Sequence, residues 1–320
     1  MIFYTYLDPD VLSVNNIEND FAMQALIGIL RGLTQNCFIA EFEDYRIQDA
    51  IKEQVKSLPD TFDRKIIKSL LAALSKRNRF IYCLIPDYSE KKDDMSCVVE
   101  QAAKCFLDLI LFSEANQDTE IPKGIEKATL ATFQTTDFEN ARSNLATNGR
   151  TFVSGELDQN DFLDWCFRKM LRYPTRIEIC DKLFGSRFSG NYEYTVKTFL
   201  RWLEQNIVDP EKCKFIFHCA KPDGKTDHHI KTQLLSFKTG RLKNMSMKIQ
   251  FYQLPDNSQV LPHDRYLITD QIVIDLGRGF DFLDRNTHKN RDLTIGYKSF
   301  KEVDNLLKSY ASAMLPRISI

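Results

Sequence analysis

The sequence has few residues that break regular structure. Glycine and proline number 12 and 10 among 320 residues, so long low-complexity linkers are not expected. Long apolar runs are also missing: LDLILF is far shorter than the roughly 18 apolar residues that a membrane-spanning helix needs. The start, MIFYTYLDPDVLS, has neither the basic region nor the cleavage site of a signal peptide. We therefore expect a cytoplasmic protein with no transmembrane segment.

No charge of one sign dominates. Lysine and arginine (43) nearly equal aspartate and glutamate (44), and the formal net charge is -1. This excludes a strongly basic chain, so any surface that binds anions must be local. The eight cysteines form no C-x-x-C pair, and cysteines and histidines do not fall at zinc spacings. We expect reduced, mostly buried thiols.

Strand-like and helix-like segments alternate along the chain. Short runs of β-branched and aromatic residues predict strands, and apolar residues at helical spacing predict helices. The predicted strands are 2–7, 37–42, 80–85, 108–113, 128–133, 176–180, 214–220, 247–254, 265–269 and 271–277. The predicted helices are 19–34, 46–58, 62–77, 94–105, 161–172, 192–205, 227–238 and 300–314.

The alternation predicts an α/β fold. A polar stretch from Asn140 to Asn160, rich in Ser, Thr and Asn, predicts a domain boundary. We therefore expect two α/β sandwich domains, residues 1–145 and 160–320, each with a mainly parallel sheet.

The clearest motif lies in the second half, where His263 to Asp270 fits the pattern H-x-R-x4-D. Residues at i and i+2 of a strand point to the same side, so His263 and Arg265 share a face. There an imidazole can attack phosphorus while the cation holds the phosphate oxygens. Asp270, at the far end of the strand, can order the site.

A glycine-containing turn, Gly277-Arg278-Gly279-Phe280-Asp281, follows one strand later. Its backbone N–H groups can approach an anion closely. The alternative is structural: His263 fills a strand edge, and Arg265 pairs with Asp281 or Asp275.

The blocks HDR and IDLGRGFDFLDR together resemble the phospholipase D-like domain at the C-terminus of MIT-domain proteins. The upstream RIEICDKLFG and TVKTFLRWLEQN resemble the strand, acid and helix of that domain, so the likeness covers about half of the chain. The superfamily signature has Lys where this chain has Arg265, and proteins with the HDR form bind phosphate or membrane lipid without the lipase reaction. The resemblance implies catalytic roles for His263, Arg265, Asp270 and Asp281. It also implies phosphate-binding roles for Gly277, Arg278 and Gly279, and no cofactor.

The superfamily reaction uses two histidine motifs, one to attack and one to protonate the leaving group. This chain has one clear motif. His229-Ile230-Lys231 is a second candidate without the acid, in which Lys231 would bind phosphate. A homodimer that brings together two copies of His263 is the other solution.

A run of basic residues precedes the motif. It can follow a nucleic-acid backbone or an anionic lipid surface, or be a solvated helix face. Its members are Lys212, Lys214, Lys221, Lys225, Lys231, Lys238, Arg241, Lys243 and Lys248.

The first half resembles PIN nucleases, which have acids at the ends of parallel strands. YLDPDVLS resembles their first strand, which ends in an acid, here Asp8; Asp94 opens a later helix, and Glu114 follows the strand DLILF. Asp49 is the best match for the remaining acid, with Glu43 and Asp44 as rivals. The resemblance implies a PIN-like Rossmannoid domain in which Asp8, Asp49, Asp94 and Glu114 hold Mg²⁺ or Mn²⁺. Glu114 stands where the family has Asp, and Asp118 is a competing acid.

Three functions compete. The first is a nuclease or phosphodiester-processing effector that acts on nucleic acid, in defence against phage or mobile elements, with a partner ATPase or helicase as an open question. The second is a module that binds phosphate on nucleic acid or anionic lipid, without catalysis, and recruits a partner. The third is a structural subunit of a larger complex.

Overall fold

A computed structural model shows a mixed α/β chain with one parallel and one mixed sheet. It describes residues 2–17, 19–42, 46–82, 95, 99–100, 103–153, 155–184, 186, 190–242, 245–255, 265–277, 279–280, 292–312 and 317–320. The chain divides into two compact units, Met1–Ala146 and Thr147–Ile320. The division lies within the polar stretch 140–160, although regular structure also occurs there.

Unit 1 contains a parallel sheet with the strand order β3-β2-β1-β4-β5. Its strands are β1 (Phe3–Leu7), β2 (Cys37–Glu41), β3 (Phe80–Tyr82), β4 (Leu109–Leu111) and β5 (Glu126–Ala128). The strands β2 and β4 are buried along their whole length, as is typical of parallel strands covered on both faces.

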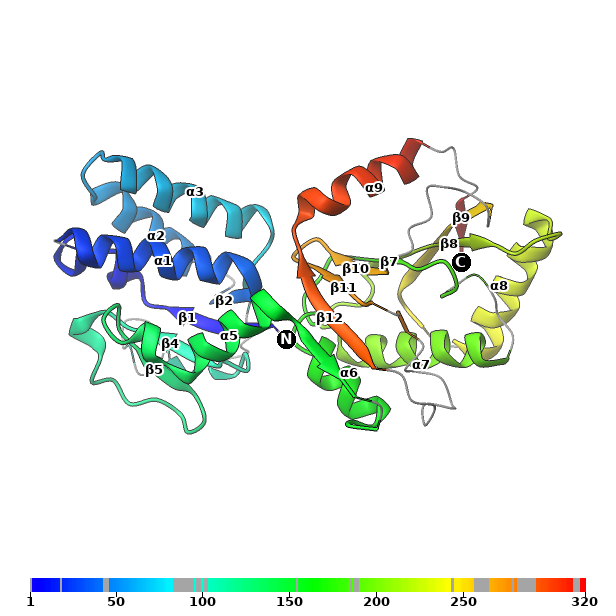
Figure 1. The fold of residues 1–320 in the computed structure, drawn as a ribbon, viewed down its shortest axis with the longest axis horizontal. Coiled ribbons are helices and arrows are strands. Elements are labelled where there is room, and N and C mark those ends of the chain that lie inside the picture. Colours follow the sequence, from blue (N-terminus) through cyan, green and yellow to red (C-terminus); the bar gives the residue numbers. More distant parts are fainter. Residues whose placement is uncertain are drawn as a thin grey trace. The chain divides into compact units, whose positions relative to one another are not determined.

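The described helices of unit 1 are α1 (Asp20–Asn36), α2 (Arg46–Ser57), α3 (Phe62–Lys76) and α5 (Asp137–Asn148). In unit 1, α1 connects β1 to β2, α2 and α3 connect β2 to β3, and α5 follows β5 (Figure 1). Short 3-10 turns also occur: η1 (Pro9–Leu12), η2 (Val14–Ile17), η3 (Glu114–Asn116) and η4 (Phe133–Thr135). Asn19 begins α1, because its side chain accepts a hydrogen bond from the Ala22 N–H at 2.9 Å.

Unit 2 contains a sheet with the order β13-β9-β8-β7-β10-β11-β12-β6. Its strands are β6 (Arg150–Phe152), β7 (Arg176–Cys180), β8 (Lys214–Lys221), β9 (Lys248–Pro255), β10 (Tyr266–Thr269), β11 (Val273–Asp275), β12 (Leu293–Lys298) and β13 (Arg317–Ser319). Strands β7, β8 and β9 are parallel, and the other pairings are antiparallel. Its helices are α6 (Gln159–Phe167), α7 (Gly190–Asn206), α8 (Asp227–Arg241) and α9 (Phe300–Ser312).

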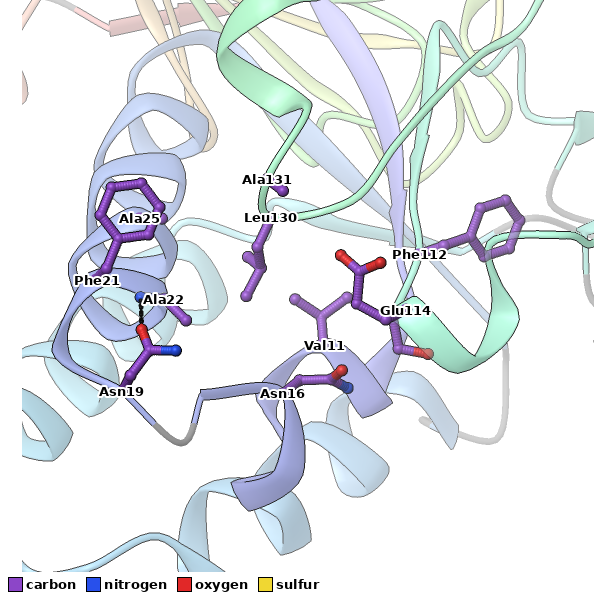
Figure 2. Close-up of a pocket in the computed structure, with 11 residues that line it drawn as sticks. Val11, Asn16, Asn19, Phe21, Ala22, Ala25, Phe112, Glu114, Leu130 and Ala131 are labelled. Atoms are coloured by element: carbon purple, nitrogen blue, oxygen red, sulfur yellow. Dashed lines mark hydrogen bonds between the residues drawn. The ribbon is translucent and has the colours of Figure 1, made fainter.

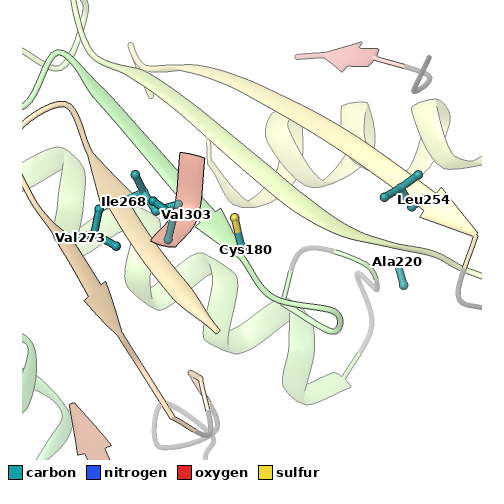
Figure 3. Packing of buried hydrophobic residues seen from close by; sticks show 6 residues of the cluster. All are labelled: Cys180, Ala220, Leu254, Ile268, Val273 and Val303. Carbon is teal, nitrogen blue, oxygen red and sulfur yellow. The ribbon is translucent and has the colours of Figure 1, made fainter. Parts of the chain in front are cut away.

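Both faces of this sheet are covered. On one face, Phe167, Phe199, Phe215, Phe217 and Phe280 pack ring against ring. On the other face, Val303 of α9 packs with residues of β7 to β11 (Figure 3). These two cores hold β7, β10 and β11, whose ends carry the residues discussed below.

Three predictions were wrong in part. The sheet of unit 2 is mixed rather than mainly parallel. The segment 128–133 is not a strand beyond Ala128, because the Thr132 hydroxyl accepts from the Thr129 N–H at 2.9 Å and closes a turn. Cys105 is disulfide-bonded, whereas Cys37, Cys166, Cys180, Cys213 and Cys219 are free and buried as expected.

Candidate functional site

The strand order of unit 1 reverses between β1 and β4. In open parallel sheets, ligands bind outside the carboxyl ends of the strands at such a reversal. Asp8 directly follows β1, and Ser113 and Glu114 follow β4 after Phe112. This edge is the candidate site of unit 1.

Asp8 is a buried hydrogen-bond acceptor at this edge, only 1% exposed. Its Oδ2 accepts from the Ser113 N–H at 2.9 Å, the Ser113 hydroxyl at 2.8 Å and the Asn116 amide at 2.9 Å. Its Oδ1 accepts from the Asp10 N–H at 3.0 Å. A carboxylate offers about four lone-pair positions, so the chain itself occupies those of Asp8. The carboxylate joins η1 to η3.

The other described acids of the predicted metal set lie apart from Asp8. Asp49 is exposed on α2 and pairs with Lys52 at 2.7 Å. Glu114 is exposed, and Asp94 lies outside the described residues, as do the rivals Glu43 and Asp44. Across the described ranges, no group of three or more His, Cys, Asp or Glu side chains is placed to hold a metal. The described residues by themselves therefore do not fit Mg²⁺ or Mn²⁺, and this site stays a prediction.

Glu41, which ends β2, is a buried acid that sequence reasoning missed. Its carboxylate accepts from the N–H groups of Phe42, Ile47 and Gln48 at 2.7–2.9 Å, and so caps the start of α2. Burial raises the pKa of Glu41, and these hydrogen bonds oppose the rise. The signal in the sequence was an acid at the end of the apolar run CFIAE.

A pocket of about 200 Å³ opens at the same edge (Figure 2). Val11 comes from η1, Asn16 from η2, and Glu114 from η3. The N-terminal part of α1 and the turn after β5 complete the wall. The pocket lies at the reversal of strand order, where the sheet topology predicts a ligand.

In unit 2, the hairpin of β10 and β11 places two parts of the predicted motif together. Tyr266 pairs with Asp275 on β11 and with Cys180 on β7. Arg265, one residue before β10, therefore lies beside Asp181, one residue after β7. The turn Gly277 to Gly279, which follows β11, lies at the same end.

Arg265 is held by groups on both sides. Its Nε lies 3.6 Å from Asp181 Oδ2, and its guanidinium donates to the Gly277 carbonyl at 3.2 Å. Asp181 is 3% exposed and also accepts from the N–H groups of Leu183 and Phe184 at 2.8 and 3.1 Å. The Arg265 side chain keeps 25% of its surface exposed. It is therefore fixed in place yet still open to a ligand.

Gly279 packs directly on this pair. It has φ +79°, and a Cβ there would lie 2.4 Å from both Arg265 Cδ and Asp181 Oδ2. Gly277 has φ +50°, and its Cβ would lie 2.8 Å from the Thr294 carbonyl oxygen. Only glycine fits these positions without a shift of the surroundings, so the turn and Arg265 form one unit.

Asp270 lies at the opposite end of the hairpin from Arg265. Its carboxylate accepts from the Thr175 N–H at 3.1 Å and from the Thr175 hydroxyl at 2.9 Å. At about 3.3 Å per strand residue, the separation from Arg265 is about 16 Å. Asp270 therefore holds the start of β7 in place and does not contact Arg265.

Among the remaining predicted residues of unit 2, the structure describes Lys231 alone. Lys231 is exposed on α8. His263, Arg278 and Asp281 lie outside the described residues.

A row of polar side chains continues from Arg265 across the sheet. Cys219 of β8 lies opposite Gln253 of β9. Burial raises the pKa of the Cys219 thiol, and the negative charge of Asp181 adds to the rise, whereas a hydrogen bond with Gln253 opposes it. The Gln253 amide is 1% exposed, and neither its oxygen nor its nitrogen has a partner at ordinary hydrogen-bond geometry. The Cys219 contact is thus a weak one. Sequence reasoning missed Asp181 as the partner of Arg265 and missed Gln253 altogether.

A buried carboxylate, Glu178, contacts a histidine and an arginine on the face that α9 covers. His218 Nε2 is 2.6 Å from Glu178 Oε2, and Arg176 is 2.8 Å from Glu178 Oε1. Burial acts to raise the pKa of Glu178, but the hydrogen bond from His218 and the charges of His218 and Arg176 outweigh it, so the pKa is lowered.

The basic run is partly neutralised by acids. Lys212 pairs with Asp209, Lys221 with Asp227 and Arg241 with Glu193, at 2.5–2.7 Å. Lys225 and Lys231 are exposed near the start of α8, and Lys238 lies near its end. These three lysines of the run lie on or near α8, where an anionic polymer can contact them.

Comparisons with known proteins find no matching family model, curated protein or solved structure. Among the helices that the structure describes, none is long and apolar enough to cross a membrane. The geometry of the residues therefore carries the functional argument.

Proposed function

We propose that unit 2 is a phosphodiester-processing module that acts on nucleic acid. One observation carries the proposal: Arg265 is fixed by Asp181 and by the Gly277 carbonyl, beside a turn that requires glycine. The arrangement lies at the carboxyl end of β7. The resemblance of the HDR and GRGFDF blocks to phospholipase D-like domains supports the same site.

The chemistry follows from the side chains. A guanidinium has several N–H donors in a planar fork that matches phosphate oxygens, and Arg265 uses only part of them on Asp181 and Gly277. The His263 imidazole attacks phosphorus, a phosphorus–nitrogen bond forms, and the bond to the leaving oxygen breaks. A second imidazole gives that oxygen its proton, and water then hydrolyses the phosphohistidine. A partner copy in a homodimer supplies the second His263.

Unit 1 takes the PIN-like role in this proposal. Its parallel sheet with the β1/β4 reversal supports a Rossmannoid domain. By analogy at the level of domain combination, such a chain acts in defence against foreign nucleic acid.

Phosphate binding without cleavage is the second candidate function. It is favoured by the buried Asp181, which already neutralises part of the Arg265 charge, and by the single histidine motif. In that case the module grips nucleic acid or anionic lipid and recruits a partner such as an ATPase or helicase. A purely structural role would explain the contacts of Arg265 with Asp181 and Gly277 but not the part of its side chain that stays exposed.

Single-turnover cleavage of a labelled oligonucleotide tests the proposal. Wild-type protein should cleave in EDTA, because the reaction at His263 needs no metal. His263→Ala should abolish cleavage and retain affinity, whereas Arg265→Ala should lose both. Intact substrate in every condition, together with weaker binding by both variants, would favour the non-catalytic candidate.

A further inference from the structure

The pocket of unit 1 carries an inference independent of the phosphodiester site. It opens where the strand order reverses, between the turns that follow β1 and β4. Its volume, about 200 Å³, is below the roughly 300–1,000 Å³ of pockets for drug-sized ligands. A single-ring or short-chain molecule is therefore the size that fits.

The walls of this pocket are mostly apolar. Val11, Ala22, Ala25, Leu130 and Ala131 line it. Such a wall suits the hydrocarbon body of an organic ligand. It does not suit Mg²⁺, which keeps several of its waters and prefers oxygen ligands.

Glu114 is the one charged residue among those that line the pocket. Figure 2 shows its carboxylate directed across the opening toward Leu130. Among the described residues, no hydrogen bond or ion pair occupies this carboxylate, in contrast to the fully used Asp8 nearby. Glu114 is exposed, so its carboxylate is open to a cationic ligand that enters the pocket from solvent.

Two further groups of the pocket wall, the Asn16 amide oxygen and the Phe21 ring, can interact favourably with a cationic ligand. The Asn16 amide nitrogen is used by the Asp10 carbonyl and the Ser13 hydroxyl, which leaves its amide oxygen as an acceptor for a ligand. Phe21, at the first turn of α1, lines the pocket with its side chain 79% exposed. An exposed aromatic ring attracts an ammonium group through its π-face.

We propose that this pocket binds a small organic cation, a primary amine with an apolar body. The ammonium group pairs with Glu114 and the Asn16 oxygen, and the apolar body packs against α1 and Leu130. Glu114 then has a ligand-binding role that requires neither a metal nor Asp94.

Methyl-resolved NMR of the 320-residue protein, with labelled Ala, Leu and Val, tests this directly. Titrated phenethylamine should shift the methyl signals of Ala22, Ala25 and Leu130 and saturate. Phenylethanol, which has the same ring but no charge, should bind at least tenfold more weakly. Equal shifts from both probes, or none from the amine, would overturn the proposal.

Two variants make the test specific. Glu114→Gln should lower the affinity for phenethylamine at least tenfold, whereas Asp118→Asn, an equal loss of charge in the same loop but outside the pocket lining, should leave it unchanged. Ala25→Leu fills the pocket from α1 and should remove binding with no loss of thermal stability. An equal loss of affinity in Glu114→Gln and Asp118→Asn would show that the amine is attracted non-specifically by negative charge, which would overturn the proposal. Shifts caused by Mg²⁺ and not by the amine would replace the proposal with a metal site.

Discussion

Gly279 shows how one residue controls the candidate phosphate site. Gly279→Ala places a methyl group against Arg265 and Asp181, at contacts of 2.4 Å. We expect the free energy of unfolding to fall by about 1–3 kcal/mol through overpacking, in addition to the strain of the positive φ. Because Arg265 must move, affinity for an oligonucleotide should fall as well. Urea denaturation and a binding titration measure the two effects.

Gly224→Ala is the matched control for this change. Gly224 also has a positive φ, +69°, but a Cβ there meets nothing within 4 Å. This variant should show only the backbone strain, about 1 kcal/mol, with unchanged oligonucleotide binding. Equal effects of the two substitutions on binding would mean that the contact with Arg265 is irrelevant.

The buried amide of Gln253 should destabilise the folded protein. A buried polar group without a partner costs about 1–3 kcal/mol, and the Gln253 amide is buried without one. Gln253→Met keeps the length of the side chain and removes the amide, so the thermal midpoint should rise. A clear fall in the midpoint would show that a bound water or ligand satisfies the amide.

The sequence predicted individual helices and strands better than it predicted their arrangement in the sheets. Apolar spacing predicted α1, α2, α3, α7 and α8 close to their observed bounds, because each buries one apolar face. It missed β6, β12 and β13, which are short or lie toward the sheet edges, where few side chains are buried on both faces. The prediction of a mainly parallel sheet in unit 2 was also wrong. The direction of strand pairing depends on contacts between distant segments, which local spacing does not reveal.

The candidate sites also contain residues that the sequence predicted and residues that it did not. His263, Arg265 and the glycine turn were found because they form a local motif. Asp181 and Gln253 were not assigned roles, because they reach the site only through the order of β9, β8, β7 and β10. Asp8 was found as an acid at a strand end, but its donors Ser113 and Asn116 follow a different strand. No local pattern reveals that its lone pairs are already used.

The buried carboxylate Glu178 of β7 predicts a dependence of stability on pH. The pKa of Glu178 is lowered from its ordinary value of 4.5. A carboxyl whose folded-state pKa is depressed stabilises the fold above its unfolded-state pKa, and this contribution is lost as pH falls through the folded-state value. The stability advantage of wild type over Glu178→Gln should therefore be full at neutral pH and shrink below about pH 4.5.

Thermal unfolding between about pH 7 and pH 3 measures this difference. Glu211→Gln is the control, because Glu211 is exposed and makes no hydrogen bond or close ion pair with the described residues. Its midpoint should follow that of wild type throughout. A constant difference between wild type and Glu178→Gln across the range would contradict a lowered pKa of Glu178.

At the scale of the whole molecule, the balance of charge requires any recognition of nucleic acid to be local. The formal net charge is -1, so no general attraction to a polyanion is expected. Among the described cations of unit 2, we assign such recognition to Arg265 and to the exposed Lys231 of α8. Binding should therefore depend on a few identifiable cations and weaken with salt as counterions are released.

Oligonucleotide affinity of Arg265→Ala, measured across a salt series, is the most direct test of this account. Loss of a charge-assisted hydrogen bond costs about 1.5–3 kcal/mol, so the affinity should fall roughly tenfold to a hundredfold. The slope of affinity against salt should also become shallower. Lys301→Ala, which removes an exposed charge on α9, should match wild type. Unchanged affinity and slope in Arg265→Ala would contradict a phosphate site at this position.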